Sequence, residues 1–362
     1  MKPLYYKIIF ISVLLFNILS CKKNAKTVNL TDNDIDTIQI DTPANMVWIP
    51  AKTFLQGAKP NDVYAMPREK PAHEVTVSGF FMDITEVTNK QFKAFVDATN
   101  YITVAEREID WEEMQKELPV GTPKPHDSIF KPGSLIFNKN VEAVVNMENY
   151  AQWWTWKIGA NWKQPQGPGS SIEGQDNFPV VHVALEDALS YCKWANRRLP
   201  TESEWESAAQ GTNNNAIFTW GNNPEFLNTK ANTWQGVFPT KNESIDGYKY
   251  IAPVKSFEPN SMGLYDMSGN VWEITSDFFN INYYKELDKN KPLINPKGAN
   301  KTFTPSNPYG TEYVIKGGSF LCHASYCASF RISAKMGMAP DSGSDHAGFR
   351  TVVTKKMLSA KN

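Results

Sequence analysis

The chain has 362 residues, of which 41% are apolar and 12% aromatic, and its formal net charge is −1. The apolar residues suffice for a sizeable core, and without a charge excess nothing favours nucleic acid or an anionic surface as a partner. The 11 Trp, 23 Pro and 21 Gly indicate long packed loops rather than a helix bundle.

The first twenty residues have the pattern of a targeting segment. Lys2 and Lys7 flank its start, and residues 8–19 form an apolar run too short to span a bilayer comfortably. The run ends Ile-Leu-Ser before Cys21, which resembles a bacterial lipobox and implies a lipid anchor on that cysteine. The alternative is a plain signal peptide. In both cases the mature chain is extracytoplasmic, at the periplasmic face or the cell surface of a bacterium.

Residues 21–44 are polar and indicate a tether between the anchor and the folded body. The body shows no internal repeat, and we expect one compact domain over residues 45–358. It begins with strand-like runs at 46–50 and 80–87. Thr88 and Gln91 then have capping-box spacing and predict a helix.

Further along, the pattern predicts a short strand at residues 180–183 and a helix at 186–196. Cys192 falls on the apolar side of that helix, where a buried inert thiol is expected. Thr201 and Glu204 form a second capping box, which predicts a helix that stops at Gly211.

Cys322 and Cys327 lie close together after a β-prone segment and the Gly317-Gly318 bend. Outside the cytoplasm a disulfide is the commoner state of such a pair, although so short a ring stabilises the fold little. Two thiolates without a dense set of His or carboxylate partners suit Cu(I). On spacing alone both interpretations remain open, with the disulfide favoured.

Two groups of oxygen-bearing residues could bind a hard cation. Asp266 and Glu273 flank a Ser-Gly turn with the carbonyls of Gly269 and Val271, and Asn232 with Asp246 could act similarly across a loop. Ca²⁺ accepts such mixed side-chain and backbone oxygens. Asp and Asn also cap turns routinely, and taken alone the residues favour that simpler role.

The chain resembles the formylglycine-generating enzymes (sulfatase-modifying factors) from about residue 46 to residue 352. The shared motifs lie at 46–50, 82–89, 179–183, 198–206, 234–236, 263–273, 316–319 and 348–350. The more specific one is Gly-Gly-Ser-x-x-Cys-His-x-Ser-Tyr-Cys at 317–327, which shifts the expectation for the cysteine pair from a disulfide to a catalytic site. The resemblance implies a mixed α+β fold, related to C-type lectins, with little regular secondary structure.

The resemblance also implies an activity, in which Cys322 and Cys327 hold Cu(I). With O2, the enzyme would oxidise a cysteine in a Cys-x-Pro/Ala-x-Arg segment of an unfolded or nascent sulfatase to Cα-formylglycine. Ser319 and Trp272 would line the pocket, with Tyr326 and His323 beside it. His346 stands where many relatives have Asn, and we expect it to replace that hydrogen-bonding residue or to tune the pocket differently.

By the same resemblance, two structural Ca²⁺ ions are expected, and the protein is expected to be a monomer. One ion would be held by Asn232, Thr233, Asp246 and Tyr248. The other would be held by Asp266, Gly269, Val271 and Glu273. Thr233, Tyr248, Gly269 and Val271 would contribute backbone oxygens.

Two other functions fit the same fold. The first is a non-catalytic lipoprotein that serves as a scaffold or adhesion module, which has no need for two thiols at one pocket. The second is an iron-dependent sulfoxide-forming oxidase, which calls for a His-rich site. The five His of the chain include no His-x3-His pair.

Overall fold

The computed structural model describes residues 40–288 and 290–360. The predicted signal peptide, Cys21 and most of the tether therefore lie outside the described residues. From residue 40 onward the chain forms one unit of contacts. None of the helices in this part combines the length and the apolar character that crossing a bilayer requires.

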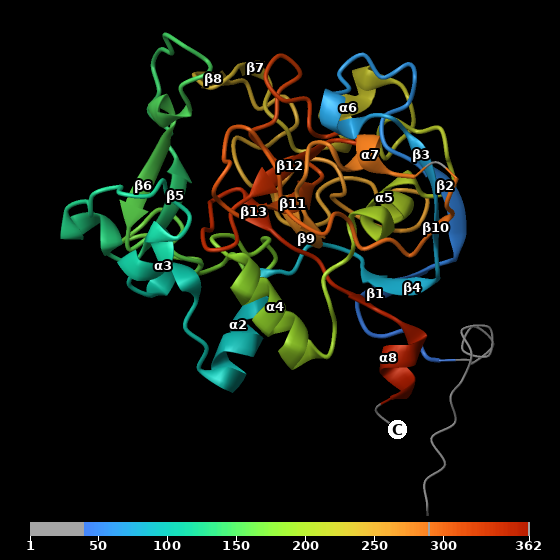
Figure 1. The fold of residues 1–362 in the computed structure, drawn as a ribbon, viewed down its shortest axis with the longest axis horizontal. Coiled ribbons are helices and arrows are strands. Elements are labelled where there is room, and N and C mark those ends of the chain that lie inside the picture. Colours follow the sequence, from blue (N-terminus) through green and yellow to red (C-terminus); the bar gives the residue numbers. More distant parts are fainter. Residues whose placement is uncertain (1–39, 289, 361–362) are drawn as a thin grey trace, which may run out of the picture. The chain divides into compact units, whose positions relative to one another are not determined.

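A four-stranded sheet lies at the centre of the described chain (Figure 1). Its order is β12 (Lys335–Met338), β11 (Tyr313–Lys316), β9 (Trp272–Phe278) and β13 (Ala347–Gly348). β11 pairs antiparallel with β9 and β12, whereas β13 runs parallel to β9. Because most of β9 is buried on both faces, the sheet belongs to the interior and gives the segment after β11 a rigid base.

Smaller sheets surround it. One joins β1 (Met46–Ile49), β4 (Phe80–Asp83) and β14 (Val352–Val353), and another joins β10 (Leu293–Ile294), β3 (His73–Val77) and β2 (Lys52–Gln56). Two hairpins pair β5 (Gly133–Phe137) with β6 (Trp154–Ile158) and β7 (Gly236–Val237) with β8 (Lys241–Asn242). The strands predicted at 46–50 and 80–87 are confirmed, although the second ends at Asp83.

Both capping boxes form as predicted. Thr88 and Gln91 start α2 (Asn89–Thr99), and Thr201 and Glu204 start α5 (Glu202–Gln210), which is capped by Gly211. α4 (Leu185–Ala195) packs against α2 and buries Cys192. The shorter helices are α3 (Trp111–Gln115), α6 (Leu227–Lys230), α7 (Tyr283–Glu286) and α8 (Lys355–Ser359), with 3-10 turns η1 (Pro67–Glu69), η2 (Val104–Glu106), η3 (Asp127–Phe130), η4 (Tyr150–Gln152) and η5 (Pro224–Phe226).

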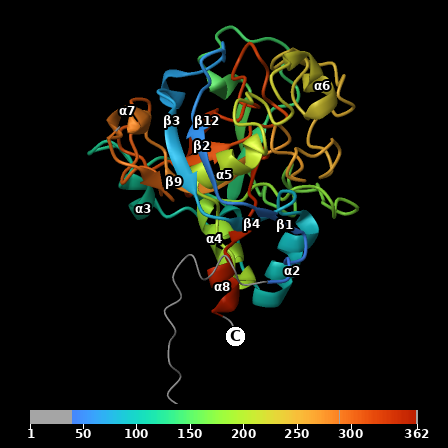
Figure 2. The same ribbon diagram turned by 90° about the vertical axis from the view of Figure 1, so that its right-hand side faces the viewer.

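Helix α5 links two of the sheets. It contacts β2 and β3 as well as β9 and β11, and Figure 2 shows it beside β2 and β3. The Trp205 side chain of this helix is fully buried and donates a hydrogen bond to Glu273 of β9 over 2.7 Å. The predicted mixed α+β fold with little regular secondary structure is thus confirmed, with α5 near its centre.

The strand predicted at 180–183 is wrong. These residues are buried, but they pair with no strand of the described chain, and isolated backbone hydrogen bonds run from the Val180 N–H to Val87 and from the His182 N–H to Ser344. His182 has φ +60°, which a continuous strand does not allow. The apolar pattern therefore predicted burial correctly and pairing incorrectly.

Candidate functional site

The Gly-Gly bend after β11 sets the position of the cysteine segment. Gly317 and Gly318 have φ +88° and +74°, in the region where residues with a Cβ are strained. A Cβ on Gly318 would lie 2.8 Å from the backbone of Ser329. The bend therefore lets the two ends of the segment, before Ser319 and after Cys327, approach each other closely.

The bend leads into a turn that brings the two cysteines together. The Cys322 N–H donates to the Ser319 carbonyl over 2.9 Å, and the Cys327 N–H donates to the His323 carbonyl over 3.0 Å. Both cysteines are free, and their side chains are hydrogen-bonded to each other. Cys322 is buried, whereas Cys327 is partly exposed. The structure thus has two thiols that are not joined by a disulfide and lie within hydrogen-bonding reach of each other.

The two thiols differ in acidity. Burial, reinforced by the neighbouring Cys327, raises the pKa of Cys322 well above its ordinary value. Burial also opposes ionisation of Cys327, but the hydrogen bond from Cys322 and those from Ser329 outweigh it and lower the pKa of Cys327. The pair therefore favours one thiolate that accepts a hydrogen bond from one thiol.

These two sulfurs fit a cuprous ion. Cu(I) prefers paired soft donors such as these. The proton of the hydrogen bond between the two sulfurs lies where a copper ion bound to both of them would lie. Across residues 40–288 and 290–360, no group of three or more His, Cys, Asp or Glu side chains could hold a metal ion. The donor set therefore fits a two-sulfur copper site and offers nothing to a His-rich iron site.

Other predicted residues surround the pair. Ser319 is buried, and its N–H donates to the Cys322 sulfur over 3.4 Å. Tyr326 stacks on Phe238 and has its pKa raised to about 12 by burial. His323 bonds the Ser325 hydroxyl through Nδ1 over 2.7 Å. His323 and Tyr326 thus form the partly open rim of the site, whereas Ser319 lies buried beneath it.

Trp272 and His346 take different positions from this rim. Trp272 is buried in the same apolar cluster as Cys322. His346 is joined to it through the backbone, because its carbonyl accepts from the Trp272 N–H. The imidazole of His346 contacts the ring of Trp154 and the Ser344 hydroxyl, so the contacts described for it do not reach the cysteines. Burial lowers the pKa of His346 to about 3 and keeps the ring neutral.

The structure adds a charged residue that no sequence pattern indicated. Arg68 of η1 lies close enough to Cys327 for their charges to interact. Its Nε donates to the Lys335 carbonyl over 2.7 Å, and the adjacent Glu69 is paired with Arg331, just after the cysteine segment. Arg68 is separated from the pair by more than half of the chain, so no local pattern could indicate this contact.

The first predicted calcium set converges on one place. Asn232 is buried, and its Oδ1 has no hydrogen-bond partner in the described part of the chain. Asp246 accepts hydrogen bonds from the N–H groups of Thr233 and Tyr248, two other members of the set. The orphaned amide oxygen of Asn232 is a ligand that Ca²⁺ accepts. Both Asp246 oxygens are engaged by protein donors, Oδ2 also by Gln235 Nε2 over 2.7 Å, so an ion here would have to share that carboxylate.

The second set adjoins the first, because Gly269 forms a bridge with Asn232. Here the structure adds Glu86, a buried carboxylate near Asp266 and Glu273. Its Oε1 accepts from Asn270 over 3.0 Å, but its Oε2 has no hydrogen-bond partner among the residues described. Burial and the negative charge of Asp266 raise its pKa well above the ordinary value. These three carboxylates do not by themselves form a group that could hold a metal ion, so a cation that relieved this repulsion would need backbone oxygens as further ligands.

Glu273 differs from the other members of the second set. Its Oε2 accepts from Arg350 Nε over 2.6 Å and from Trp205, and its Oε1 accepts from Arg350 Nη2 over 2.7 Å. Both oxygens are therefore engaged by protein donors. An ion at this set would have to share that carboxylate with Arg350.

Comparisons with known proteins agree with this architecture. The family described as Sulfatase-modifying factor enzyme 1-like domain matches residues 31–355. The formylglycine-generating enzyme of Thermomonospora curvata is 41% identical over 307 residues, 84% of this chain and 92% of the relative. That of Mus musculus is 40% identical over 307 residues, 84% of this chain and 74% of the relative.

Among solved structures, PvdO from Pseudomonas aeruginosa has the same fold. Its TM-score is 0.56 at 22% identity, over 85% of this chain and 94% of that one. The likeness predicted from the motifs is confirmed by the curated relatives, which span most of the described residues. The chain therefore belongs to the family of formylglycine-generating enzymes, the sulfatase-modifying factors.

Proposed function

We propose that this protein is a copper-dependent oxidase that converts a cysteine of a sulfatase polypeptide to Cα-formylglycine. The observation that carries the proposal is the pair of reduced, hydrogen-bonded thiols at Cys322 and Cys327. Family membership supports the reaction and, more generally, a need for copper. The substrate segment Cys-x-Pro/Ala-x-Arg and the Cu(I) state are the finer parts of the proposal.

The overall reaction fixes what the site must accomplish. The substrate thiol on its methylene carbon and O2, with two electrons and two protons, give an aldehyde, hydrogen sulfide and water, and the electrons come from a thiol reductant in solution. Copper, which Cys322 and Cys327 would hold, would allow O2 to react with the thiolate of the bound substrate. The protein residues must therefore bind a third sulfur beside this pair and exclude bulk water.

The residues around the pair suit these tasks. The Ser319 N–H points to the Cys322 sulfur and holds it in place. Cys327 is the more acidic and the more exposed of the two thiols, so a polypeptide would reach it more readily than Cys322. Tyr326, packed between Trp153 and Phe238, forms an apolar wall that limits access of water.

A lipid anchor at Cys21, two structural Ca²⁺ ions and a monomeric state are further parts of the proposal. The orphaned oxygens of Asn232 and Glu86 support the ions. The anchor is supported only by the sequence around Cys21, and the monomer only by the family resemblance. The anchor would place sulfatase maturation at a membrane outside the cytoplasm.

The test uses the full chain, loaded with Cu(I) and given a Cys-x-Pro-x-Arg peptide, O2 and a thiol reductant. We expect mass spectrometry to show that the peptide loses sulfur and gains oxygen. Cys322→Ser and Cys327→Ser should abolish both conversion and stoichiometric copper binding. Cys192→Ala should preserve both, because this thiol of helix α4 packs in the same apolar cluster as Cys322 but takes no part in the hydrogen-bonded pair.

Each failure has a separate meaning. Copper binding without conversion of the peptide would point to a different substrate. A parent protein that binds no copper would overturn the oxidase and favour the non-catalytic scaffold. Full activity in the Cys327→Ser variant would show that the pair is not the site.

A further inference from the structure

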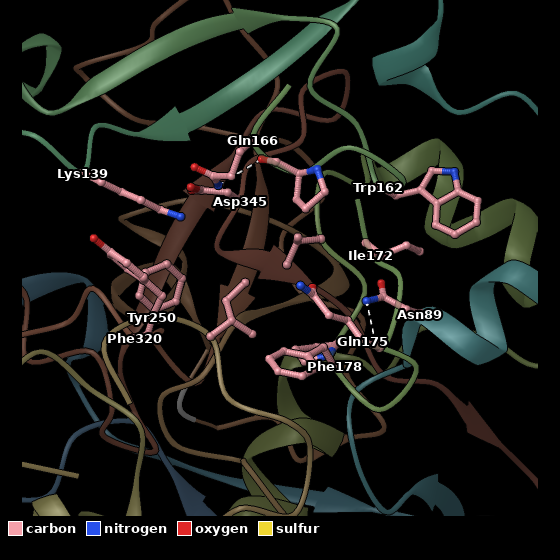
Figure 3. A pocket seen from close by; sticks show the side chains of 14 residues that line it. Asn89, Lys139, Trp162, Gln166, Ile172, Gln175, Phe178, Tyr250, Phe320 and Asp345 are labelled. Carbon is pink, nitrogen blue, oxygen red and sulfur yellow. Dashed lines mark hydrogen bonds between the residues drawn. The ribbon is translucent and has the colours of Figure 1, made fainter. Parts of the chain in front are cut away.

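A separate pocket of about 180 Å³ lies beside the segment that carries the cysteines, and the cysteines do not line it (Figure 3). Asp345, Gln166 and Lys139 lie at one end, and Trp162 lies towards the other. Tyr250 and Phe320 add further aromatic wall. The pocket thus combines an apolar lining with a single carboxylate.

Asp345 is an unusual residue for such a place. The residue is only 3% exposed, and its Oδ2 accepts a hydrogen bond from the Phe137 N–H over 3.0 Å. Its Oδ1 is buried and has no hydrogen bond of good geometry within the described ranges, although the Gln166 amide, which donates to the Pro165 carbonyl, lies near enough to interact with the carboxylate. Burial raises the pKa of Asp345 to about 7, although the nearby positive charge of Lys139 acts to lower it. A buried carboxylate oxygen without a partner is costly, and a bound donor would remove that cost.

Lys139 does not provide that donor in this structure. Its ammonium lies 4.3 Å from the centre of the Tyr250 ring, and no ion pair with Asp345 is found in the described part of the chain. Burial lowers the pKa of Lys139, and the charge of Asp345 partly offsets this effect. Because the residue as a whole is exposed, its side chain is free to move outward and admit a ligand.

We propose that this pocket binds an organic cation, an ammonium or guanidinium group on a short aliphatic chain, with Asp345 as its counter-ion. The cationic head would donate to the orphaned Oδ1 and displace the Lys139 ammonium from Tyr250, and the apolar walls would bury the chain. The same chemistry is available from a small free amine and from a basic side chain of a polypeptide. This site does not depend on the proposed oxidation, because neither cysteine takes part.

Calorimetric titration of the full chain with butylguanidinium chloride tests the proposal without any enzyme assay. Asp345→Asn should weaken binding by roughly tenfold or more, as expected for a lost charge-assisted hydrogen bond. Lys139→Met should strengthen binding several-fold, because it removes the competing cation. Asp176→Asn, an exposed carboxylate near one wall of the pocket, should leave the affinity unchanged.

The Asp345 and Lys139 variants should change the binding affinity in opposite directions, which makes the test decisive. No binding by the parent, equal binding by the Asp345→Asn and Asp176→Asn variants, or no gain on Lys139→Met would each overturn the proposal. The last result remains informative even if Asp345→Asn does not fold. Peptides distinguish the two sources: competition by a Cys-x-Pro-x-Arg peptide, but not by its Arg→norleucine analogue, would identify a substrate side chain. Without competition, the ligand is a small free cation.

Discussion

The Glu273–Arg350 pair allows a sharp test of how the core and the second calcium set are related. Both side chains are fully buried, and three hydrogen bonds of 2.6 to 2.7 Å join the Glu273 carboxylate to Arg350 and Trp205. Glu273→Gln removes the charge but keeps the shape, and it leaves the guanidinium buried without its main partner. Breaking a buried pair in this way costs about 3–5 kcal/mol.

The structure favours the lower end of that range. Glu86 and Asp266 also interact with the charge of Arg350, and its guanidinium still donates to the carbonyls of Asp83 and Tyr265. We therefore expect a loss of about 3 kcal/mol, or roughly 6–12 °C in Tm if the shift per kcal/mol is that of a domain of ordinary size.

Thermal unfolding of the full chain, with Ca²⁺ and with EGTA, measures this loss. Asp97→Asn is the matched control, because it removes a carboxylate from an exposed pair with Lys93 and should cost at most about 1 kcal/mol. The reasoning fails if Glu273→Gln costs no more than the control. It also fails if the cost disappears in EGTA, since calcium rather than Arg350 would then be the partner that matters.

Two further predictions follow from the buried ionisable groups. Iodoacetamide at about pH 8 should label Cys327 of the folded protein well before Cys322 and Cys192. Burial raises the pKa of both of these thiols, to about 12 for Cys192. Equal labelling rates of the three cysteines, measured by peptide mass spectrometry, would contradict this prediction. Burial lowers the pKa of His182 from 6.5 to about 4, so its stabilising contribution, complete above pH 6.5, is lost as the pH falls towards 4. Urea unfolding between about pH 7.5 and pH 5 should therefore show about 2 kcal/mol less loss of stability in His182→Asn than in the parent. If His182→Asn left the pH dependence of stability unchanged, His182 would not be the group responsible for this loss.

The local elements follow from the sequence because their determinants lie within a few residues of one another. Thr88 with Gln91 and Thr201 with Glu204 form capping boxes within one helical turn, and both helices start where predicted. The proximity of Cys322 and Cys327 is guaranteed in the same way, by a short segment after a Gly-Gly bend. What their spacing left open was whether they form a disulfide, and the structure has them as free thiols.

The sequence by itself therefore determined helices α2, α4 and α5, strands β1 and β4, the family motifs and the closeness of the two cysteines. Only the tertiary structure decided the charge environment around them, because those contacts join distant segments. Arg68 meets Lys335 across 267 residues, and Glu86 meets Asn270 across 184. The same holds for residues 180–183, where burial was predictable and pairing was not. Local patterns encode which side chains are apolar and where helices begin, whereas the partner of a buried charge is set by the path of the whole chain.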